Sequence, residues 1–167
     1  MKLIDKVDNE PLAALREQLQ HESAVLLEVE GITPFMVPMA AQPDADGKHI
    51  WFFTSKDNEL FGHLSGEHNA RICISNGTEN FWAQVNGSIK EFFDSEKVAE
   101  HWSVATESWF EQGKLDSKLT LLEFTVHEAD ISCSTDSSLT FGFETMKALV
   151  GDQDEPHISI HRHLVVE

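Results

Sequence analysis

The chain has 167 residues, about the length of one domain, and 41% of them are hydrophobic, enough for a core. The 29 acidic residues outnumber the 12 Lys and Arg residues, which gives a formal charge of −17 and excludes a basic face for nucleic acid or an anionic membrane. No apolar run approaches the roughly 20 residues that cross a bilayer. Residues 1–5 lack the apolar segment of a signal peptide, so we expect a soluble cytoplasmic protein.

The first part of the chain predicts a helix followed by a strand. The helix is expected to run from Asp8, a suitable N-cap, to about Ser23, because three leucines follow at helical spacing. From Ala24 to Val29 the hydrophobic period changes to two, which predicts a half-buried antiparallel strand. The leucines of the helix are Leu12, Leu15 and Leu19.

Two strands joined by a hairpin are expected next. Residues 35–40 predict a strand that is irregular or at a sheet edge near Pro38, because proline cannot donate to a ladder. Asp46-Gly47 predicts a hairpin turn. Residues 49–54 are apolar on both faces and predict a central strand, followed by a short helix that starts near Asp57. The side chains that this helix would bury are Leu60, Phe61 and Leu64.

A second hairpin is expected in the middle of the chain. Residues 70–75 and 81–93 alternate in polarity and predict two strands joined at Asn76-Gly77. Asp94 is placed to cap a helix. The buried stripe of that helix would consist of Val98, Trp102 and Ala105.

The C-terminal part predicts a last strand over residues 119–127, with strand character again near 131 and 139–141. Residues 143–150 predict a helix that Gly151 ends. Residues 152–167 are polar, and we expect much of this tail to be mobile. Together the elements predict a mostly β fold, an antiparallel barrel with flanking helices in one domain over 1–151, because closure removes exposed strand edges.

The most informative stretch is the end of the 49–54 strand. Thr54 and Ser55 supply two hydroxyls and Lys56 a positive charge, directly before the expected helix N-terminus, whose free N–H groups bind phosphate readily. The alternative is that these residues only cap and turn the chain. The sequence therefore offers a phosphate site here as one of two interpretations.

Other candidate sites have simpler interpretations. His157, His161 and His163 raise the possibility of a metal site, but no single helix or strand would align all three and no acidic or cysteine ligand is fixed nearby, so surface histidines and no metal are expected. Cys73 alternates with isoleucines and is expected to be an inert core thiol. Trp82, beside Gln84 on a long strand, could flank a planar ligand, as could Trp109, whereas Trp102 is expected in the core. No general acid or base stands out.

Several phrases in this order resemble the pyridoxamine 5′-phosphate oxidase-like split barrels, in particular the general stress protein 26 branch. The resemblance covers about residues 8–151. The phrases that carry it are Val37-Pro38-Met39, the run from Ile50 to Asp57, Asn69-Ala70-Arg71-Ile72, Val85-Asn86-Gly87, Ser108-Trp109-Phe110 and the run from Met146 to Gly151.

The resemblance implies a six-stranded antiparallel split barrel of the FMN-binding type that works as a homodimer. It implies that flavin mononucleotide (FMN) lies between the two subunits, with its phosphate at the Thr54-Ser55 turn, its ring along Pro38-Met39, and the partner contributing its long strand. If the protein is an enzyme, the flavin would carry hydride or electron transfer on an unknown substrate. The positions assigned to the cofactor are Val37, Pro38, Met39, Phe53, Thr54, Ser55, Lys56, Leu60, Trp82 and Gln84.

Three positions depart from the pattern of the family. Many relatives have Arg where this chain has Val37, Lys at the place of Leu60, and an aromatic residue at the place of Ser132. Two missing cations remove two charge-assisted phosphate contacts of about 1.5–3 kcal/mol each, which weakens FMN binding by roughly 10²–10⁴. The alternative is therefore a flavin-free split-barrel homodimer with a binding or stress-response role and no catalysis, or one that takes a less phosphorylated planar ligand.

Overall fold

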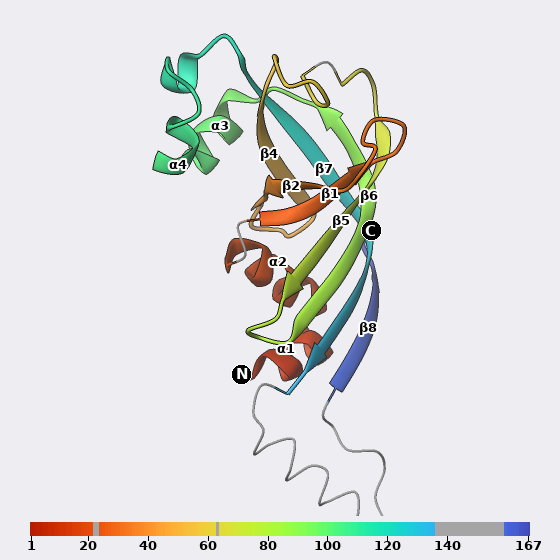
Figure 1. Cartoon of the computed structure of the whole chain (residues 1–167). Coiled ribbons are helices and arrows are strands. Elements are labelled where there is room, and N and C mark those ends of the chain that lie inside the picture. Colours follow the sequence, from red (N-terminus) through yellow and green to blue (C-terminus); the bar gives the residue numbers. More distant parts are fainter. Residues whose placement is uncertain (22–23, 63, 136–158) are drawn as a thin grey trace, which may run out of the picture.

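The computed structural model describes residues 1–21, 24–62, 64–135 and 159–167, and in them eight strands form one antiparallel sheet (Figure 1). The strands follow the order β2-β1-β5-β6-β7-β4-β3, and β8 pairs with β7 beside this path. The strands are β1 (Ala24–Val29), β2 (Val37–Ala40), β3 (Gln42–Pro43), β4 (His49–Ser55), β5 (His68–Asn76), β6 (Phe81–Glu91), β7 (Leu119–Ser134) and β8 (Ser159–Val165).

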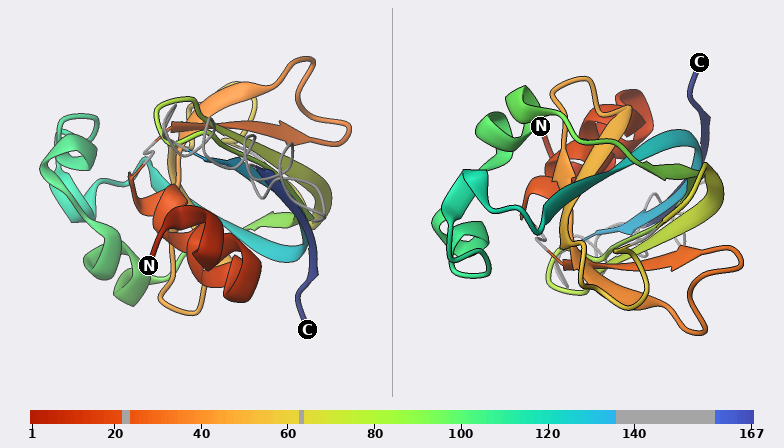
Figure 2. Two further views of the ribbon diagram at one scale, coloured as in Figure 1. Left: turned by 90° about the horizontal axis from the view of Figure 1, so that it is seen from below. Right: turned by 90° about the horizontal axis from the view of Figure 1, so that it is seen from above.

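The sheet curls around the main core, so that β2 comes into contact with β4 (Figure 2). This confirms the predicted mostly β split barrel with flanking helices, and the short β3 and the C-terminal β8 add to the six expected strands. Side chains at alternate positions point into the curl, and among the largest of these fully buried side chains are Leu27, Phe52, Ile72, Phe81 and Phe124.

The N-terminal helix is in fact two helices, α1 (Leu3–Asn9) and α2 (Pro11–His21). The prediction that Asp8 caps a single helix is wrong, because Asp8 lies inside α1 and Pro11 starts α2, where its missing N–H costs nothing. Both helices lie on the concave side of the sheet, where α1 contacts β7 and β8 and α2 contacts β3 and β8 (Figures 1 and 2). Leu15 and Leu19 of α2 are fully buried in the main core.

The strand β7 organises the sheet because it pairs along its whole length. One edge pairs with β6, while the other pairs first with β4, through Leu119–Thr125, and then with β8, through Glu128–Ser134. A β-bulge interrupts the β6–β7 ladder: Asn86 faces Glu128 and Gly87 faces Val126, which leaves His127 as the extra residue. The residues of β7 that point inward therefore have even numbers before the bulge and odd numbers after it, from Ala129 on.

The expectation of a mobile tail is wrong for residues 159–165, which form β8. Ile160 is buried, and Arg162 pairs with Asp8 of α1. An alternating polar strand of this kind gains its stability from the ladder with β7 and from these contacts, neither of which the sequence pattern reveals. The predicted strand near 139–141, the helix over 143–150 and the domain limit near 151 lie outside the described residues.

Beside the main core lies a second, smaller one, which explains why β4 is apolar on both faces. β4 is not a central strand in the expected sense, because β3 covers its outer edge at only two residues. Its outward face packs instead against α3 (Ser95–His101) and the residues that follow, before the 3₁₀ turn at Gly113–Leu115. This second core contains Trp51, Val98, Phe110, Leu119 and Leu121, with Phe53 and Trp102 packed against it.

The predicted cap of α3 is confirmed, since the Asp94 carboxylate accepts hydrogen bonds from the N–H groups of Glu96 and Lys97. The helix ends at His101, and a separate short helix, α4 (Val104–Glu107), begins after a Ser103 cap. Ala105 is therefore exposed, and its predicted place in a continuous buried stripe is wrong.

After β4 the chain forms turns, so the prediction of a helix that starts near Asp57 is wrong. The Asn58 carboxamide oxygen accepts from the N–H groups of Leu60 and Phe61, an arrangement that turns the chain without continuing into a helix. Phe61 and Leu64 are nevertheless buried, as expected. The described residues contain no helix that is long and apolar enough to span a membrane.

Candidate functional site

Several predicted site residues lie on the outer face of the sheet, the face that points away from the main core. The register places one residue from each of six strands in a row across this face, which we call the outer row. It consists of Pro38, Leu26, Cys73, Gln84, Asp130 and His163. Trp82 lies one row away, with 43% of its surface exposed, and Leu26 is 44% exposed. An exposed indole and an amide thus share one face, as a planar ligand or a second protein would require.

Cys73 belongs to this face and is not the core thiol that was predicted. It is half-buried opposite Gln84, and burial raises the pKa of its thiol. A raised pKa lowers the fraction of thiolate, which is the reactive form. The prediction that this thiol is inert therefore agrees with its surroundings, whereas the prediction that it lies in the core is wrong.

The Val37-Pro38-Met39 phrase lies on β2, which is an edge strand, as Pro38 predicted. Val37 and Met39 pack against the main core, whereas Pro38 is exposed on the outer face. Alternate main-chain groups of an edge strand have no partner in the sheet. Recognition by β2 would therefore use main-chain atoms and not the side chains of Val37 or Met39.

Thr54 lies near the C-terminal end of β4. It is buried on the inner face of β4, directly opposite Thr120 of β7. The Thr120 hydroxyl is fully buried and has no hydrogen-bond partner, an arrangement that costs about 1–3 kcal/mol. Sequence reasoning missed Thr120, because nothing in the local pattern shows that β4 pairs with β7.

The turn after Thr54 offers fewer donors than a helix N-terminus would. The N–H groups of Lys56, Asp57 and Asn58 already donate to Lys118 O, Ser55 Oγ and Ser55 O, and those of residues 60–62 donate within the turn. The side chain of Lys56 is exposed. Lys118, a second cation that was not singled out, lies beside it and pairs with Asp57 at 2.9 Å, an interaction that raises the pKa of Lys118.

Phe53 and Leu60 take structural positions. The Phe53 ring meets the Trp102 ring edge to face, with centroids 5.8 Å apart, in the second core. Leu60 is half-buried against the main core. Trp109, in contrast, is 83% exposed. Of the ten predicted cofactor residues, Phe53 and Leu60 therefore pack within the protomer, as Val37 and Met39 also do.

Within one protomer the structure does not bring the two groups of predicted residues together. Thr54, Ser55 and Lys56 belong to β4 and its turn, while Trp82 and Gln84 belong to β6, and β7 lies between the two strands in the sheet. A ligand that contacts both groups would need them from two different copies of the chain.

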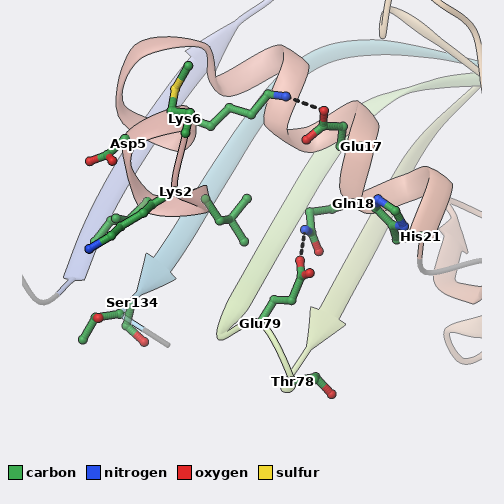
Figure 3. Close-up of a pocket in the computed structure, with 13 residues that line it drawn as sticks. Lys2, Asp5, Lys6, Glu17, Gln18, His21, Thr78, Glu79 and Ser134 are labelled. Atoms are coloured by element: carbon green, nitrogen blue, oxygen red, sulfur yellow. Dashed lines mark hydrogen bonds and ion pairs between the residues drawn. The ribbon is translucent and has the colours of Figure 1, made fainter. Parts of the chain in front are cut away.

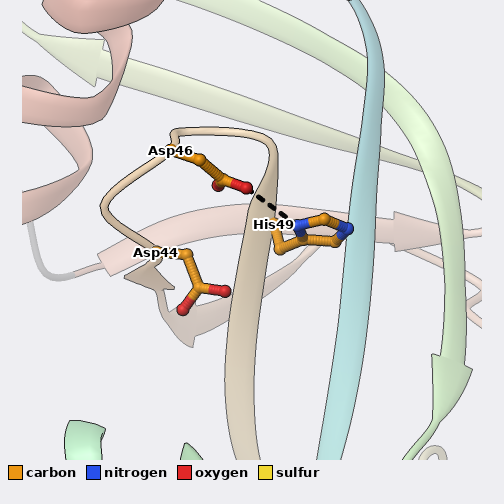
Figure 4. Close-up of side chains that lie close together, drawn as sticks. All are labelled: Asp44, Asp46 and His49. Carbon is orange, nitrogen blue, oxygen red and sulfur yellow. Dashed lines mark ion pairs between the residues drawn. The ribbon is translucent and has the colours of Figure 1, made fainter. Parts of the chain in front are cut away.

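The most strongly paired polar cluster lies between the β3–β4 turn and α3. Asp44, 8% exposed, accepts hydrogen bonds from Lys97 Nζ at 3.0 Å and His101 Nε2 at 2.9 Å. Burial alone would raise the pKa of Asp44, but the hydrogen bond from His101 and the ammonium of Lys97 outweigh it and lower the pKa. On the same turn, Asp46 Oδ2 lies 3.4 Å from His49 Nδ1 (Figure 4). The Lys97 ammonium already pairs with the buried Asp44 carboxylate. This cluster therefore attaches α3 to the β3–β4 hairpin.

The statement that no acidic residue lies near the C-terminal histidines is wrong. His161 and His163 project from the same, exposed side of β8, and Asp130 of β7 lies between them. Asp130 Oδ1 is 3.0 Å from His163 Nδ1 and 3.5 Å from His161 Nε2. His157 lies outside the described residues.

Three surface hollows in the described part of the chain lie away from the residues that were predicted to bind the cofactor. A hollow of about 670 Å³ lies between α1, α2 and the β5–β6 turn, where Gln18 bonds to Glu79 and Lys6 to Glu17 (Figure 3). One of about 510 Å³ lies on the outer face next to the bulge, around Arg71 and Glu128. A third, of about 330 Å³, adjoins His101. None of the three is lined by any of the ten residues assigned to the cofactor.

The comparisons with known proteins agree with the curled sheet and the phrases on it. Residues 10–156 match the family described as "Pyridoxamine 5'-phosphate oxidase like", and the chain belongs to this family. No curated protein matches.

Among solved structures, the general stress protein 26 from a Jannaschia species aligns with a TM-score of 0.78 and 26% identity, over 93% of this chain and 99% of that one. A general stress family protein from Xanthomonas campestris is 31% identical, with a TM-score of 0.69, over 78% of this chain and 91% of its own. The general stress FMN/FAD binding protein from Xanthomonas citri is also 31% identical, with a TM-score of 0.68, over 75% and 89%.

Proposed function

We propose that the protein is a homodimeric, cytoplasmic flavoprotein that binds FMN between two copies of the chain. The observation that carries this proposal is the 31% identity to a protein named for FMN/FAD binding, over 75% of this chain. The separation of the predicted residues onto two strands on either side of β7 supports a shared site, since one copy would provide the Thr54 end and the other the outer face around Trp82.

The residues at both ends suit the two parts of a flavin. At the phosphate end, Ser55 offers a partly exposed hydroxyl, and Lys56 and Lys118 supply positive charge nearby. On the outer face, the Trp82 indole offers an apolar surface and Gln84 an amide that can both donate and accept. When bound, the flavin would supply hydride or electron transfer on a substrate still to be identified. The protein would hold and orient it.

The expected result of an FMN titration, followed by flavin fluorescence, is saturable quenching with one FMN per chain. Replacement of both phosphate-side hydroxyls, Thr54→Ala with Ser55→Ala, should abolish measurable binding while the protein still unfolds cooperatively. The Trp82→Ala variant should weaken binding by about tenfold, because stacking on an aromatic ring contributes on the order of 1 kcal/mol.

Trp109→Ala is the matched control, because this indole is also exposed but lies in the segment after α4 and not on β6. Its affinity for FMN should equal that of the unmodified protein. Unchanged affinity in the Thr54 and Ser55 double variant would place the site elsewhere, and colourless protein that fails to quench FMN at micromolar concentration would exclude the flavin function.

The shared site also requires a dimer. Sedimentation or size exclusion with light scattering should give twice the mass of the 18.8 kDa chain at low micromolar concentration. A monomer under these conditions would leave Trp82 and Leu26 exposed to water and would remove the proposed site.

A specific observation favours a second function, a flavin-free binding or stress-response protein without catalysis. The turn after β4 uses nearly all its N–H groups internally, and Val37 and Leu60, at the two positions where the family resemblance implies cations, pack against the core. The FMN titration separates the two functions, since a dimer that does not quench FMN supports the second.

A further inference from the structure

We propose that two copies of the chain meet through the outer face along β6, and that Arg71 of each copy pairs with Glu128 of the partner subunit. This pairing rests on the homodimer of the proposed function and would hold its two halves together. The charges on this face and the register of three neighbouring strands, β5, β6 and β7, favour a second copy of the chain as the partner.

Arg71 carries a guanidinium group that lacks an acidic partner in its own protomer. Its Nε donates to Asn86 Oδ1 at 3.0 Å, which directs the group away from β1 and toward β6. Glu28 of β1 lies directly opposite, yet among the described residues Arg71 forms no ion pair with it or with any other carboxylate. In this part of the chain its two terminal nitrogens are therefore free to hold a carboxylate in a forked contact.

Carboxylates surround this guanidinium on the outer face. The hollow of about 510 Å³ beside the bulge is lined by Arg71 together with Glu28, Glu30 and Glu128. The strands β1 and β5 together contain a single Lys or Arg residue, which is Arg71. Two copies of a chain with a formal charge of −17 repel each other unless cations face the carboxylates at their contact, and Arg71 is placed to do so.

Glu128 reaches this face because of the β-bulge at His127. The bulge shifts the alternation of β7, so that Glu128 points outward with 44% of its side chain exposed. The Asn86 amide, which accepts from Arg71, donates to Glu128 Oε1 at 2.9 Å. Asn86 therefore holds Arg71 and Glu128 on either side of β6, with the second carboxylate oxygen directed to a further contact.

The register places these three residues where a two-fold axis would pair them. Arg71 of β5 and Glu128 of β7 both lie opposite Asn86 of β6, one strand spacing of about 4.8 Å to either side. A two-fold axis that runs along β6 exchanges the two sides, so that Arg71 of each copy faces Glu128 of the partner subunit. The ion pair therefore forms twice in one dimer.

The shape of the sheet favours the same strip. The strand β6 is the middle one in the order β2-β1-β5-β6-β7-β4-β3, and the sheet curls with the outer face on its convex side (Figure 2). Two convex faces touch along their middle, and here β6 also presents the exposed Trp82 side chain. A dimer formed in this way would cover apolar surface and pair the charges in one contact.

The test is the dissociation constant of the dimer of the full chain, measured by sedimentation equilibrium. Arg71→Glu should weaken the dimer by about a hundredfold, because carboxylates would then face each other across the interface. Arg71→Gln, which removes the charge alone, should weaken it by about tenfold. Glu128→Arg should act like Arg71→Glu, whereas the two changes together exchange the charges and should restore the affinity to within about tenfold of the unmodified protein.

Arg16→Glu is the matched control, because it changes the net charge by the same amount on α2, at the concave side of the sheet. Its dissociation constant should stay within about threefold of that of the unmodified protein. The side chain of Arg71 is exposed, so its variants should fold, and circular dichroism of the dissociated chains checks this.

Equal dimer affinity in Arg71→Glu and Arg16→Glu would overturn this interface while the dimer of the proposed function remains. If Arg71→Glu and Glu128→Arg each dissociate the dimer but their combination does not restore it, Arg71 does not face Glu128. A monomeric unmodified protein would instead overturn the proposed dimer together with this pairing.

Discussion

Gly87→Ala is expected to destabilise the protein by about 3 kcal/mol or more, the largest effect of any single substitution proposed here. A Cβ atom on Gly87 would lie 2.0 Å from the carbonyl oxygen of Thr125 and 2.8 Å from the Phe124 ring. The first of these contacts is with backbone, which cannot move aside without separating β6 from β7 at the bulge. Urea unfolding followed by circular dichroism measures the loss.

Gly77→Ala is the matched control for this substitution. Gly77 lies in the turn between β5 and β6, nothing would contact its Cβ within 4 Å, and its backbone is not left-handed. The change should stay within about 0.5 kcal/mol of the unmodified protein. If both glycine variants unfold at the same urea concentration, β6 and β7 do not approach each other at Gly87 as closely as the structure shows.

Asp44→Asn is expected to cost about 2–3 kcal/mol at pH 7, the second largest effect. The substitution removes the charge that faces Lys97 and His101 but keeps the shape of the side chain. Breaking a buried ion pair typically costs more, but the Lys97 side chain is 26% exposed and can turn toward water. Chemical unfolding at pH 7 measures the difference. In Glu100→Gln, whose side chain is 49% exposed, the change should stay within about 0.5 kcal/mol.

The pH dependence of this difference follows from the lowered pKa of Asp44. A carboxyl group whose pKa is lower in the folded than in the unfolded state stabilises the fold above its usual pKa of 3.8, and this contribution disappears as the pH falls through the folded value. The gap between the unmodified protein and Asp44→Asn should therefore be constant near neutrality and shrink below about pH 4. A gap that widens on acidification would contradict this account.

Local signals in the sequence predicted much of the fold. The alternation of Val25, Leu27 and Val29, the turn at Asp46-Gly47 and the Asp94 cap were all confirmed, since each depends on residues within a few positions of one another. The helix expected after Ser55 does not form, although Asn58 accepts from the N–H groups of Leu60 and Phe61 as a helix N-cap would; a single turn forms, closed by the hydrogen bond from Gly62 N–H to Asn58 O.

The candidate sites were predictable only in part. Trp82 and Gln84 are on the exposed face, as their position on a long alternating strand suggested. Thr120 and Lys118 were missed, because their importance comes from pairing with β4 more than 60 positions earlier. The same is true of Asp130, which meets His163 through a strand pair that no local pattern announces.

The sequence by itself determined the class of fold, the hairpins and the acidic surface, because hydrophobic period, turn residues and charge act over short distances along the chain. Only the tertiary structure decided which strands flank β7, and that a bulge at His127 turns Glu128 and Asp130 outward toward β8. The physical reason is that a one-residue shift in a ladder reverses every side chain beyond it, and this shift lies next to Gly87, where the two strands come too close for a Cβ atom.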